Sequence, residues 1–406
     1  MAAWRFYSVA LAGPTAGEVR DEIPLGEVTV TDRLKGVGSL AATIPLRHAK
    51  ANRTNLETEN TLIVAERDGV LQFAGPLLDL NRGLGDEVVG LGCDGMWNLV
   101  RRRVIRSSAG MTYGTTAAGE VRFSAVDQFR IVADLVAHME SISGGSLGIT
   151  ASYTALSGVT RDRTYEADKG KTIGEAIEQL ADVENGFDWQ LEPVGTVDSL
   201  SFVLRLSYPF RGRNTGYRFE LTAPDVDPAL PDFLLDEGGE RVLDENGESI
   251  IVGRLGSVRS TGSGNILAVG SAESSRGRLS RVTAVGPGEG PAQLVRHAAD
   301  PNLLGVLPLT EGSVAYLDVT NTNTLLAHAR RSQSVDARAS RLPVLRVDPN
   351  AKPTYGSYIT GDIVHVTIDD GWDQFDGPAR IVGRTITVDR VGRETVDLEV
   401  AELGRF

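Results

Sequence analysis

The chain has 406 residues, of which 41% are hydrophobic and 23% charged, and its formal net charge is −13. Its length leaves room for two to four domains of about 100–200 residues each. The acidic balance argues against tight nucleic-acid binding, because such a surface repels phosphate. A single cysteine, Cys93, excludes an intrachain disulfide and a thiolate metal cluster. No segment has the apolar length of a membrane span or the form of a signal peptide, so we expect a soluble protein made without export.

The first part of the chain, residues 1–105, is predicted to be mostly β. The 46 glycines and many β-branched residues are typical of short strands joined by tight turns. The expected strands are Trp4–Leu11, Gly26–Asp32, Leu40–Ile44, a hairpin over 61–75, Leu77–Asn81 and Val88–Leu91. The part ends at the basic run Arg101-Arg102-Arg103, which we interpret as a solvated edge or a partner for carboxylates of a neighbouring chain, with nucleic-acid contact as a lesser alternative. We predict a β domain here.

Residues 106–207 change to a mixed α+β pattern. Ser124 and Asp127 form a capping pair before a helical stripe. The apolar residues of that stripe are Val126, Phe129, Val132, Val136 and Met139. A second helix is expected from Thr172, because Glu175 completes a capping box, and Asn185-Gly186 supplies its left-handed stop. Two strands follow, near Phe187–Leu191 and Leu200–Leu206.

Residues 208–340 are predicted to form a second β-rich domain with an acidic β-meander at 225–252 and helices. In the meander, Leu235–Glu240 and Leu243–Glu248 repeat the same acidic pattern around the hairpin pairs Gly-Gly and Asn-Gly. Calcium binding is one interpretation, but the acids do not have the alternate spacing of an EF-hand loop. A solvated acidic projection is the preferred alternative.

The rest of this domain and the C-terminal segment complete the predicted elements. Strands are expected near Ile266–Val269 and Leu279–Val285, and helices over Pro291–Ala299 and Thr324–Arg338. Residues 341–406 return to alternating strands and form a C-terminal β segment. These strands are Leu342–Val347, Asp362–Ile368, Ala379–Asp389 and Glu394–Glu402.

One nine-residue pattern occurs near both ends of the chain. Asp68–Pro76 and Asp370–Pro378 both have the form D-G-x-x-Q-F-x-G-P, and each lies between alternating apolar runs. Asp-Gly favours a tight hairpin turn, Phe anchors one face of the sheet, and Gly-Pro ends the pairing because Pro has no ladder donor. The predicted turn and anchor residues are Asp68, Gly69, Phe73, Gly75, Asp370, Gly371, Phe375 and Gly377. We infer one β unit used twice, with coincidence between two ordinary hairpins as the alternative.

No catalytic, cofactor or metal site can be assigned from the sequence. The five histidines are scattered without metal-ligand spacing, and Cys93 ends an apolar strand, as a buried inert thiol does. A glycosidase-like carboxylate pair stays open, although nothing distinguishes one pair from the many acids. We therefore expect no enzyme and no cofactor.

Four stretches together resemble a known family. They are Leu34–Pro45, Leu62–Gly75, Thr172–Gln190, and Tyr358–Val366 followed by Gly377–Val382. Their order along the chain resembles that in minor tail proteins of actinobacteriophages with long flexible tails. These belong to the tail-tip hub proteins related to the baseplate hub of contractile tails.

The resemblance implies a mainly β fold with α+β insertions, in which two related β-barrel hub domains accompany a smaller α+β domain. It implies that residues 1–105 form the first, β-barrel-like hub domain and that residues 341–406 complete the second barrel. It also implies a homotrimer, so that six barrels form a ring that continues the hexameric tail tube. The implied partners are the tail tube or a distal tail protein, the tape measure protein and other minor tail proteins. DNA would pass through without specific binding, and no stable membrane insertion is expected. The implied location is the tail tip of the virion, after synthesis in the host bacterial cytoplasm.

Two other functions stay open at this point. One is a receptor- or glycan-binding tail protein that acts in host attachment, and the other is a cell-wall-degrading tail enzyme. Some relatives carry a C-terminal peptidase or a fibre-binding extension, whereas this sequence stops at Phe406, just after its last predicted strand. We therefore expect such activities to come from other proteins of the tail.

Overall fold

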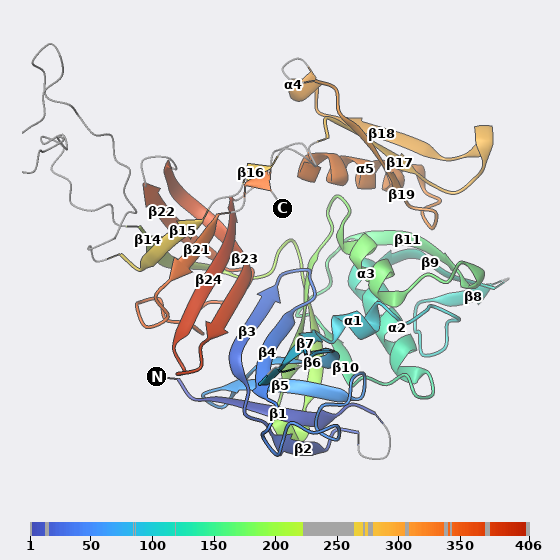
Figure 1. Cartoon of the computed structure of the whole chain (residues 1–406). Coiled ribbons are helices and arrows are strands. Elements are labelled where there is room, and N and C mark those ends of the chain that lie inside the picture. Colours follow the sequence, from blue (N-terminus) through green and yellow to red (C-terminus); the bar gives the residue numbers. More distant parts are fainter. Residues whose placement is uncertain are drawn as a thin grey trace, which may run out of the picture.

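The structure, a computed structural model, describes most of the chain and confirms the mainly β fold class (Figure 1). The described residues are 2–12, 16–83, 85, 87–117, 119–221, 264–270, 273–274, 279–304, 308–336, 340–341, 343–369 and 374–402. The acidic meander predicted at 225–252 lies outside them. Within the described ranges the strands form one 13-stranded sheet, three 3-stranded sheets and one 2-stranded sheet. None of the helices in those ranges has the length and apolar character of a membrane span.

Seven strands make up what we name the N-terminal unit. They are β1 (Trp4–Ala10), β2 (Val19–Glu22), β3 (Gly26–Arg33), β4 (Ser39–Pro45), β5 (Thr61–Arg67), β6 (Val70–Asn81) and β7 (Val88–Asp94). Their order in the sheet is β3-β4-β7-β6-β5-β1-β2. Alternate residues of β3 and β4 are buried, as the period-2 pattern of the sequence predicts. A short helix, α1 (Trp97–Val100), follows β7.

Six strands make up the C-terminal unit. They are β14 (Asn214–Glu220), β15 (Ile266–Gly270), β21 (Val344–Val347), β22 (Ile363–Asp369), β23 (Gln374–Val388) and β24 (Glu394–Glu402). They pair in the order β15-β21-β24-β23-β22-β14. If the strands of each unit are numbered by their order along the chain, β15, β21, β24, β23, β22 and β14 correspond to β3, β4, β7, β6, β5 and β1. The two units therefore have the same strand order. The units differ at the last strand, because β14 is parallel to β22 whereas β1 is antiparallel to β5.

The mixed part lies between the two units in sequence (Figure 1). It packs around a second core that it shares with the N-terminal unit, which contributes Tyr7, Val9, Leu62, Val64 and Ala74. Its elements are β8 (Thr115–Ala117), β9 (Glu120–Asp127), α2 (Gln128–Ser141), β10 (Ile149–Ser152), β11 (Thr160–Glu166), η1 (Ala167–Lys169), α3 (Ile173–Ala181), β12 (Asp188–Val194), η2 (Val197–Ser199) and β13 (Ser201–Ser207). The predicted capping box of Thr172 and Glu175 is confirmed. The predicted helix start at Ser124 is wrong, because β9 continues to Asp127, whose carboxylate then caps α2 through the Phe129 amide at 2.9 Å.

A small subdomain is inserted between β15 and β21. It comprises β17 (Arg281–Val285), η3 (Gly290–Ala292), β18 (Val295–Ala299), α4 (Pro301–Leu304), β19 (Glu311–Ala315) and α5 (Thr322–Asp336). A two-stranded ribbon, β16 (Glu273–Ser274) with β20 (Ser340–Arg341), leads to it and keeps the register of β15 with β21. In the N-terminal unit, the matching strands β3 and β4 are joined by a short turn at 34–38.

One helix prediction in the inserted subdomain is confirmed and one is wrong. The helix expected at Thr324–Arg338 is α5. The helix expected at Pro291–Ala299 is a single 3-10 turn followed by β18, which pairs along its whole length with β17. Pro291 does start a turn, but Val295–Ala299 alternates between the two faces of a sheet, and pairing with β17 satisfies its backbone.

The inserted subdomain packs against the α+β part through α5. His328 of α5 is buried, its ring stacks on Tyr316 with centroids 4.1 Å apart, and its Nε2 lies 3.3 Å from Nη2 of Arg163 on β11. Burial and the neighbouring Arg163 lower the pKa of His328 to about 3. The neutral imidazole therefore accepts a hydrogen bond from the buried guanidinium.

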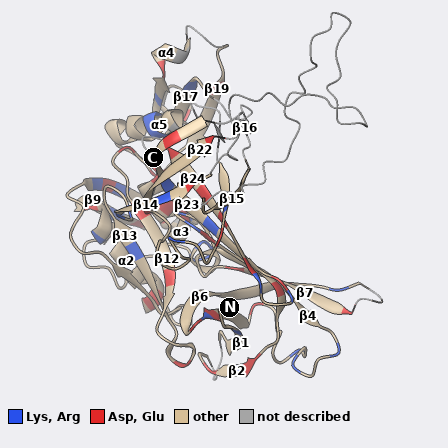
Figure 2. Cartoon of the chain, turned by 90° about the vertical axis from the view of Figure 1, so that its left-hand side faces the viewer, with Lys and Arg blue, Asp and Glu red and all other residues tan. Residues whose placement is uncertain are grey.

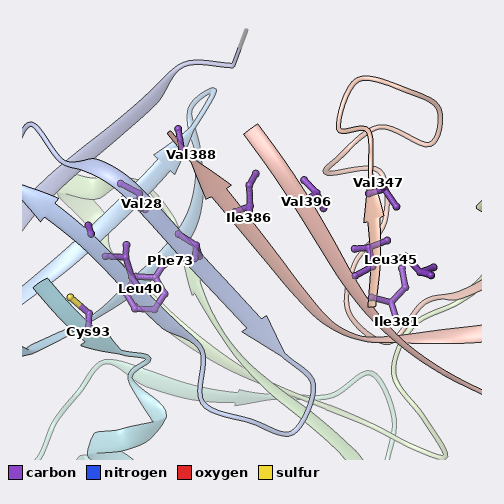
Figure 3. Close-up of a cluster of buried hydrophobic side chains, with 14 of the residues drawn as sticks. Val28, Leu40, Phe73, Cys93, Leu345, Val347, Ile381, Ile386, Val388 and Val396 are labelled. Atoms are coloured by element: carbon purple, nitrogen blue, oxygen red, sulfur yellow. The ribbon is translucent and has the colours of Figure 1, made fainter. Parts of the chain in front are cut away.

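A single hydrophobic core extends across both β units (Figure 3). Val28, Leu40 and Phe73 enter it from the N-terminal unit, and Leu345 and Ile386 from the C-terminal unit. The strand pairing of the described residues runs from β15 to β2 without returning on itself, so the sheet is open there rather than a closed barrel. The two units thus fold as halves of one sheet with a common core.

Candidate assembly surfaces

The first repeated hairpin has the turn geometry that its sequence predicts. Asp68 and Gly69 join β5 to β6 with φ of 52° and 80°. Both values are positive, as a type I′ turn requires. The Asp68 carboxylate also accepts a hydrogen bond from the Ala3 amide at 2.8 Å, which ties the start of the chain to the turn. Asp370 and Gly371, the corresponding residues of the second motif, lie outside the described residues.

The remaining motif residues occupy different environments in the two units. Phe73 is buried, whereas Phe375 is half-buried at the edge of the same core. A Cβ at Gly75 would lie 2.0 Å from the Asp94 carbonyl oxygen, so only glycine fits there. A Cβ at Gly377 would lie 3.7 Å from the Phe375 ring, an ordinary contact. The close approach of backbone therefore constrains only the first of the two glycines.

Both units place a β-bulge in corresponding strand pairs, β6 with β7 and β23 with β24, two residues after Pro76 in the first unit and four after Pro378 in the second. Leu77 pairs with Cys93 and Asp79 with Gly92, so β6 has one extra residue there. In the same way Ile381 pairs with Val400 and Gly383 with Glu399, so β23 has one extra residue. A bulge bends its strand and increases the local twist. Because the bulges coincide in topology as well as in sequence order, the repeat involves backbone geometry and not only the nine-residue motif.

The two units join through direct pairing of β3 with β23. Residues Val28–Arg33 pair antiparallel with Gly383–Val388, and β3 occupies the edge of β23 where β22 ends. Across this joint the hydroxyls of Thr29 and Thr387 lie 3.3 Å apart. The hydroxyls of Thr31 and Thr385 lie 3.1 Å apart. The edge strand of one unit thus completes the sheet of the other.

A polar network at the joint also includes the α+β part. Asp32 at the end of β3 accepts hydrogen bonds from Arg384 of β23 at 2.9 Å and from the Thr360 hydroxyl at 3.2 Å. Its other carboxylate oxygen accepts from the Gln190 amide of β12. Thr360 also donates to Gln190 at 2.8 Å. One carboxylate therefore contacts all three parts of the fold.

A second set of contacts joins the units beside the first hairpin. Arg67, the residue before the turn, donates to both carboxylate oxygens of Glu394 at 2.8 and 3.0 Å. The indole of Trp4 donates to the same carboxylate at 2.6 Å. Gln72 of the first motif accepts a hydrogen bond from the Tyr355 hydroxyl at 3.1 Å. The turn region is thus one side of the joint between the units.

The face of the joined sheet opposite the core carries small polar side chains and paired charges. Four half-buried threonines line the joint on this face: Thr29, Thr31, Thr385 and Thr387. Arg33 pairs with Glu399 at 2.5 Å, and Arg346 pairs with Asp397 at 2.9 Å. Both signs of charge are interspersed along the strands (Figure 2). Since Arg33 and Arg346 each have a carboxylate partner, neither is a free cation on this hydrophilic face.

Cys93 and Arg101, two residues that the sequence suggested for a functional role, are buried or paired within the chain. Cys93 is buried, and burial raises the pKa of its thiol. Arg101 of the basic run pairs with Glu178 of the same chain at 2.7 Å. Across the residues that the structure describes, no group of His, Cys, Asp or Glu side chains could hold a metal ion. Sequence reasoning missed Asp32, Arg384 and Glu394, because their partners are hundreds of residues away in the chain.

Known proteins provide a comparison for this fold. No protein-family model and no curated protein matches the sequence. The 43 kDa tail protein of prophage MuSo2 from Shewanella oneidensis is 13% identical and superposes with a TM-score of 0.57 over 98% of this chain and 98% of its own. A tail protein from Neisseria meningitidis MC58 is also 13% identical, with a TM-score of 0.57 over 99% of this chain and 97% of that protein. The chain therefore has the fold of these two tail proteins along almost its entire length.

Proposed function

We propose that the protein is a structural hub of the tail tip or baseplate of a long-tailed phage. In this proposal three copies form a ring that continues the tail tube and anchors other tail-tip proteins, and the protein catalyses no reaction. The observation that carries the proposal is the joint of β3 with β23, through which two units of the same topology share one sheet and one core. The fold shared with two tail proteins supports the same conclusion.

Ring formation follows from the repeat by a simple geometric argument. Two matching units in one chain present the same kind of surface twice, so a closed ring of three chains has six similar positions around its axis. Such a ring matches a tube of sixfold symmetry. Interfaces of an obligate assembly of this kind bury on the order of 2,000 Å² each. The partners in this proposal are the tail tube or a distal tail protein, the tape measure protein and other minor tail proteins.

The threonine-rich face of the joined sheet suits the wall of a conduit. Its small side chains leave room, and its paired charges, such as Arg33 with Glu399, offer few free cations to phosphate. DNA would pass such a wall without being retained. We place the protein at the tip of the virion tail, after synthesis in the host cytoplasm.

The division of the chain into parts belongs to this proposal. Residues 1–105 and 341–406 contribute the two hub units, 106–207 form the α+β domain, and 208–340 contain the first strands of the second unit together with the inserted subdomain. In this division the α+β domain and the inserted subdomain lie outside the ring wall and are available to neighbouring tail proteins.

The experiment that tests the proposal is a mass measurement of the purified full chain, combined with a low-resolution image of the particle. We expect a trimer in solution or on assembly, and threefold density for this chain at the end of the tail tube. A monomer at all concentrations, with no ring in particles, would contradict the proposal. Release of fragments from cell-wall substrate by the purified chain, abolished by one carboxylate substitution, would support the tail-enzyme alternative instead.

A further inference from the structure

A cleft lies where α5 faces the loops that follow α3 and β13. Its volume is about 540 Å³, within the range of pockets that hold small ligands. Separate parts of the fold line it: Lys35 comes from the turn between β3 and β4, Arg331 from α5 and Arg380 from β23. Since α5 belongs to the inserted subdomain, the repeat of the two β units does not supply this cleft twice.

The cleft is positively charged, in contrast to the chain as a whole, whose net charge is −13. Its cations are Lys35, Arg330, Arg331 and Arg380, and its acids are Glu184 and Asp188. Arg380 is buried, and its charge is compensated by Asp188. The positive charge that faces the cleft therefore comes from the other three cations.

These three cations are held weakly or not at all by carboxylates of the chain. Arg330 reaches the Glu184 carboxylate only at 3.6 Å, and the two side chains are 59% and 48% exposed. Lys35 pairs with the exposed Asp182 at 3.1 Å. Exposed pairs of this kind contribute little to stability, so an incoming carboxylate can replace either acid. Arg331 is half-buried and forms no ion pair with a carboxylate of the described residues.

The packing of α5 directs Arg331 into the cleft. Arg331 is three residues after His328, so both side chains lie on the same face of the helix. His328 is buried against Arg163 of β11 and stacks on Tyr316. The contact that docks α5 thus also positions the Arg331 guanidinium before any ligand binds, which reduces the entropy lost on binding.

An exposed aromatic ring lies beside these cations. Phe210 lines the same cleft and is 46% exposed, and the Arg380 guanidinium lies 5.6 Å from its ring centre. Aromatic and Arg side chains are enriched at the energetic centres of protein interfaces. A ligand that offers a carboxylate to Arg331 and an apolar group to Phe210 would therefore match this surface.

We propose that the cleft binds an acidic peptide segment of a neighbouring tail protein, with carboxylates on the three cations and an apolar side chain on Phe210. This inference rests on the proposed hub function and identifies the chemistry of one partner. Guanidinium groups bind carboxylates through two parallel hydrogen bonds. Nucleic acid is a poorer match, because Asp182 and Glu184 lie beside the cations and would repel a continuous run of phosphates.

The test is a titration of the full chain with the fluorescein-labelled, amidated peptide Asp-Glu-Phe-Asp-Glu, followed by fluorescence anisotropy. The variant Arg331→Glu is compared with Arg390→Glu, a charge reversal of equal size beyond the end of β23, where Arg390 is 67% exposed. Arg330→Glu provides a second variant at an exposed position, where the fold should be unaffected. Urea unfolding of each variant checks that the chain is folded.

We expect Arg331→Glu and Arg330→Glu each to weaken peptide binding at least tenfold, and Arg390→Glu to change it by less than about twofold. Phe210→Ser should remove the preference for this peptide over Asp-Glu-Ser-Asp-Glu. Equal weakening in the Arg331→Glu and Arg390→Glu variants, or no binding by the natural chain, would overturn the proposal. Tighter binding of a single-stranded oligonucleotide, lost in Arg331→Glu, would also overturn it and assign the cleft to nucleic acid.

The native mass of the same samples separates this site from the hub proposal. A trimer that does not bind the peptide would overturn the site and leave the ring intact, whereas a monomer that binds it would overturn the ring alone. In particles, carbodiimide should join Lys35 to a carboxylate of another tail protein, and Lys35→Arg should abolish this cross-link while keeping the charge. A cross-link from Lys35 to Asp182 alone would contradict the proposal.

Discussion

Arg384 of β23 donates a hydrogen bond from Nη2 to the Asp32 carboxylate of β3 across 2.9 Å, and the same carboxylate accepts from Thr360 and Gln190. The pair joins strands that are 352 residues apart in sequence. It lies at the point where the two β units and the α+β part meet. Its loss should therefore affect the stability of the whole fold rather than one hairpin.

Replacing Asp32 by Ala should destabilise the protein by about 3 kcal/mol, because Arg384 would stay largely buried without its carboxylate. Asp397→Ala provides the control, since its partner Arg346 is half exposed and such pairs contribute about 0.5 kcal/mol. Urea unfolding of both variants measures the difference. Equal losses in the two variants would mean that Asp32 has no special role at the joint.

The two motif glycines should respond differently to alanine. Gly75→Ala should lower the free energy of unfolding by about 3 kcal/mol, because the new Cβ meets the Asp94 carbonyl oxygen at 2.0 Å and backbone must move. Gly377→Ala should change it by less than about 0.5 kcal/mol, since the Cβ finds an ordinary contact. Denaturant melts of the two variants check this, and a larger effect at Gly377 would contradict the packing argument.

A β-branched residue in the first turn should strain the hairpin. Gly69 has φ of 80° with no atom near its absent side chain, so Gly69→Val should cost about 1–2 kcal/mol from backbone strain alone. Gly69→Asn should cost less, because asparagine tolerates positive φ. From the repeated motif we predict the same direction for Gly371→Val. If both valine variants still build infectious tails, these turns have no importance for assembly.

The docking of α5 should weaken in acid. His328 has a pKa of about 3 in the folded protein, against an ordinary value of 6.5, so the unfolded chain binds its proton first as the pH falls. The contribution of neutral His328 to the free energy of unfolding is therefore fully present above pH 6.5. It decreases toward pH 3, with a loss on the order of 3 kcal/mol near pH 4. Arg163, Arg161 and Lys171 all disfavour the charged imidazole.

Hydrogen exchange of the α5 amides between pH 7 and pH 4, corrected for the intrinsic rate, measures this effect. His328→Gln has no charge to gain and should remove most of the dependence on pH in that range. If the variant and the natural protein lose protection equally, other groups control the docking of α5.

The parts of the fold that depend on short-range signals could be predicted from the sequence. The capping box at Thr172 and the Asp68-Gly69 turn need only residues a few positions apart, and the mainly β class follows from alternation. The joint of β3 with β23 could not be predicted, because nothing near Thr29 indicates a partner at Thr387. The error at Pro291–Ala299 has the same cause, since pairing with β17 decides the conformation of a segment with weak local preference. The role of Asp32 in joining the units could not be predicted for the same reason, because its partner Arg384 is 352 residues away in sequence.

The inserted subdomain adds a further consequence to the repeat. It is attached at the tip of the ribbon that starts at β15 and β21, whereas the matching tip between β3 and β4 is a short turn. Alternate positions of a ring of three chains would therefore carry a module and the others would not. Such a ring would present six nearly equivalent binding positions to the tube. It would present only three inserted subdomains to proteins on its other side. In the proposed ring, the insertion would provide a physical means by which a sixfold tail changes to threefold symmetry at its tip.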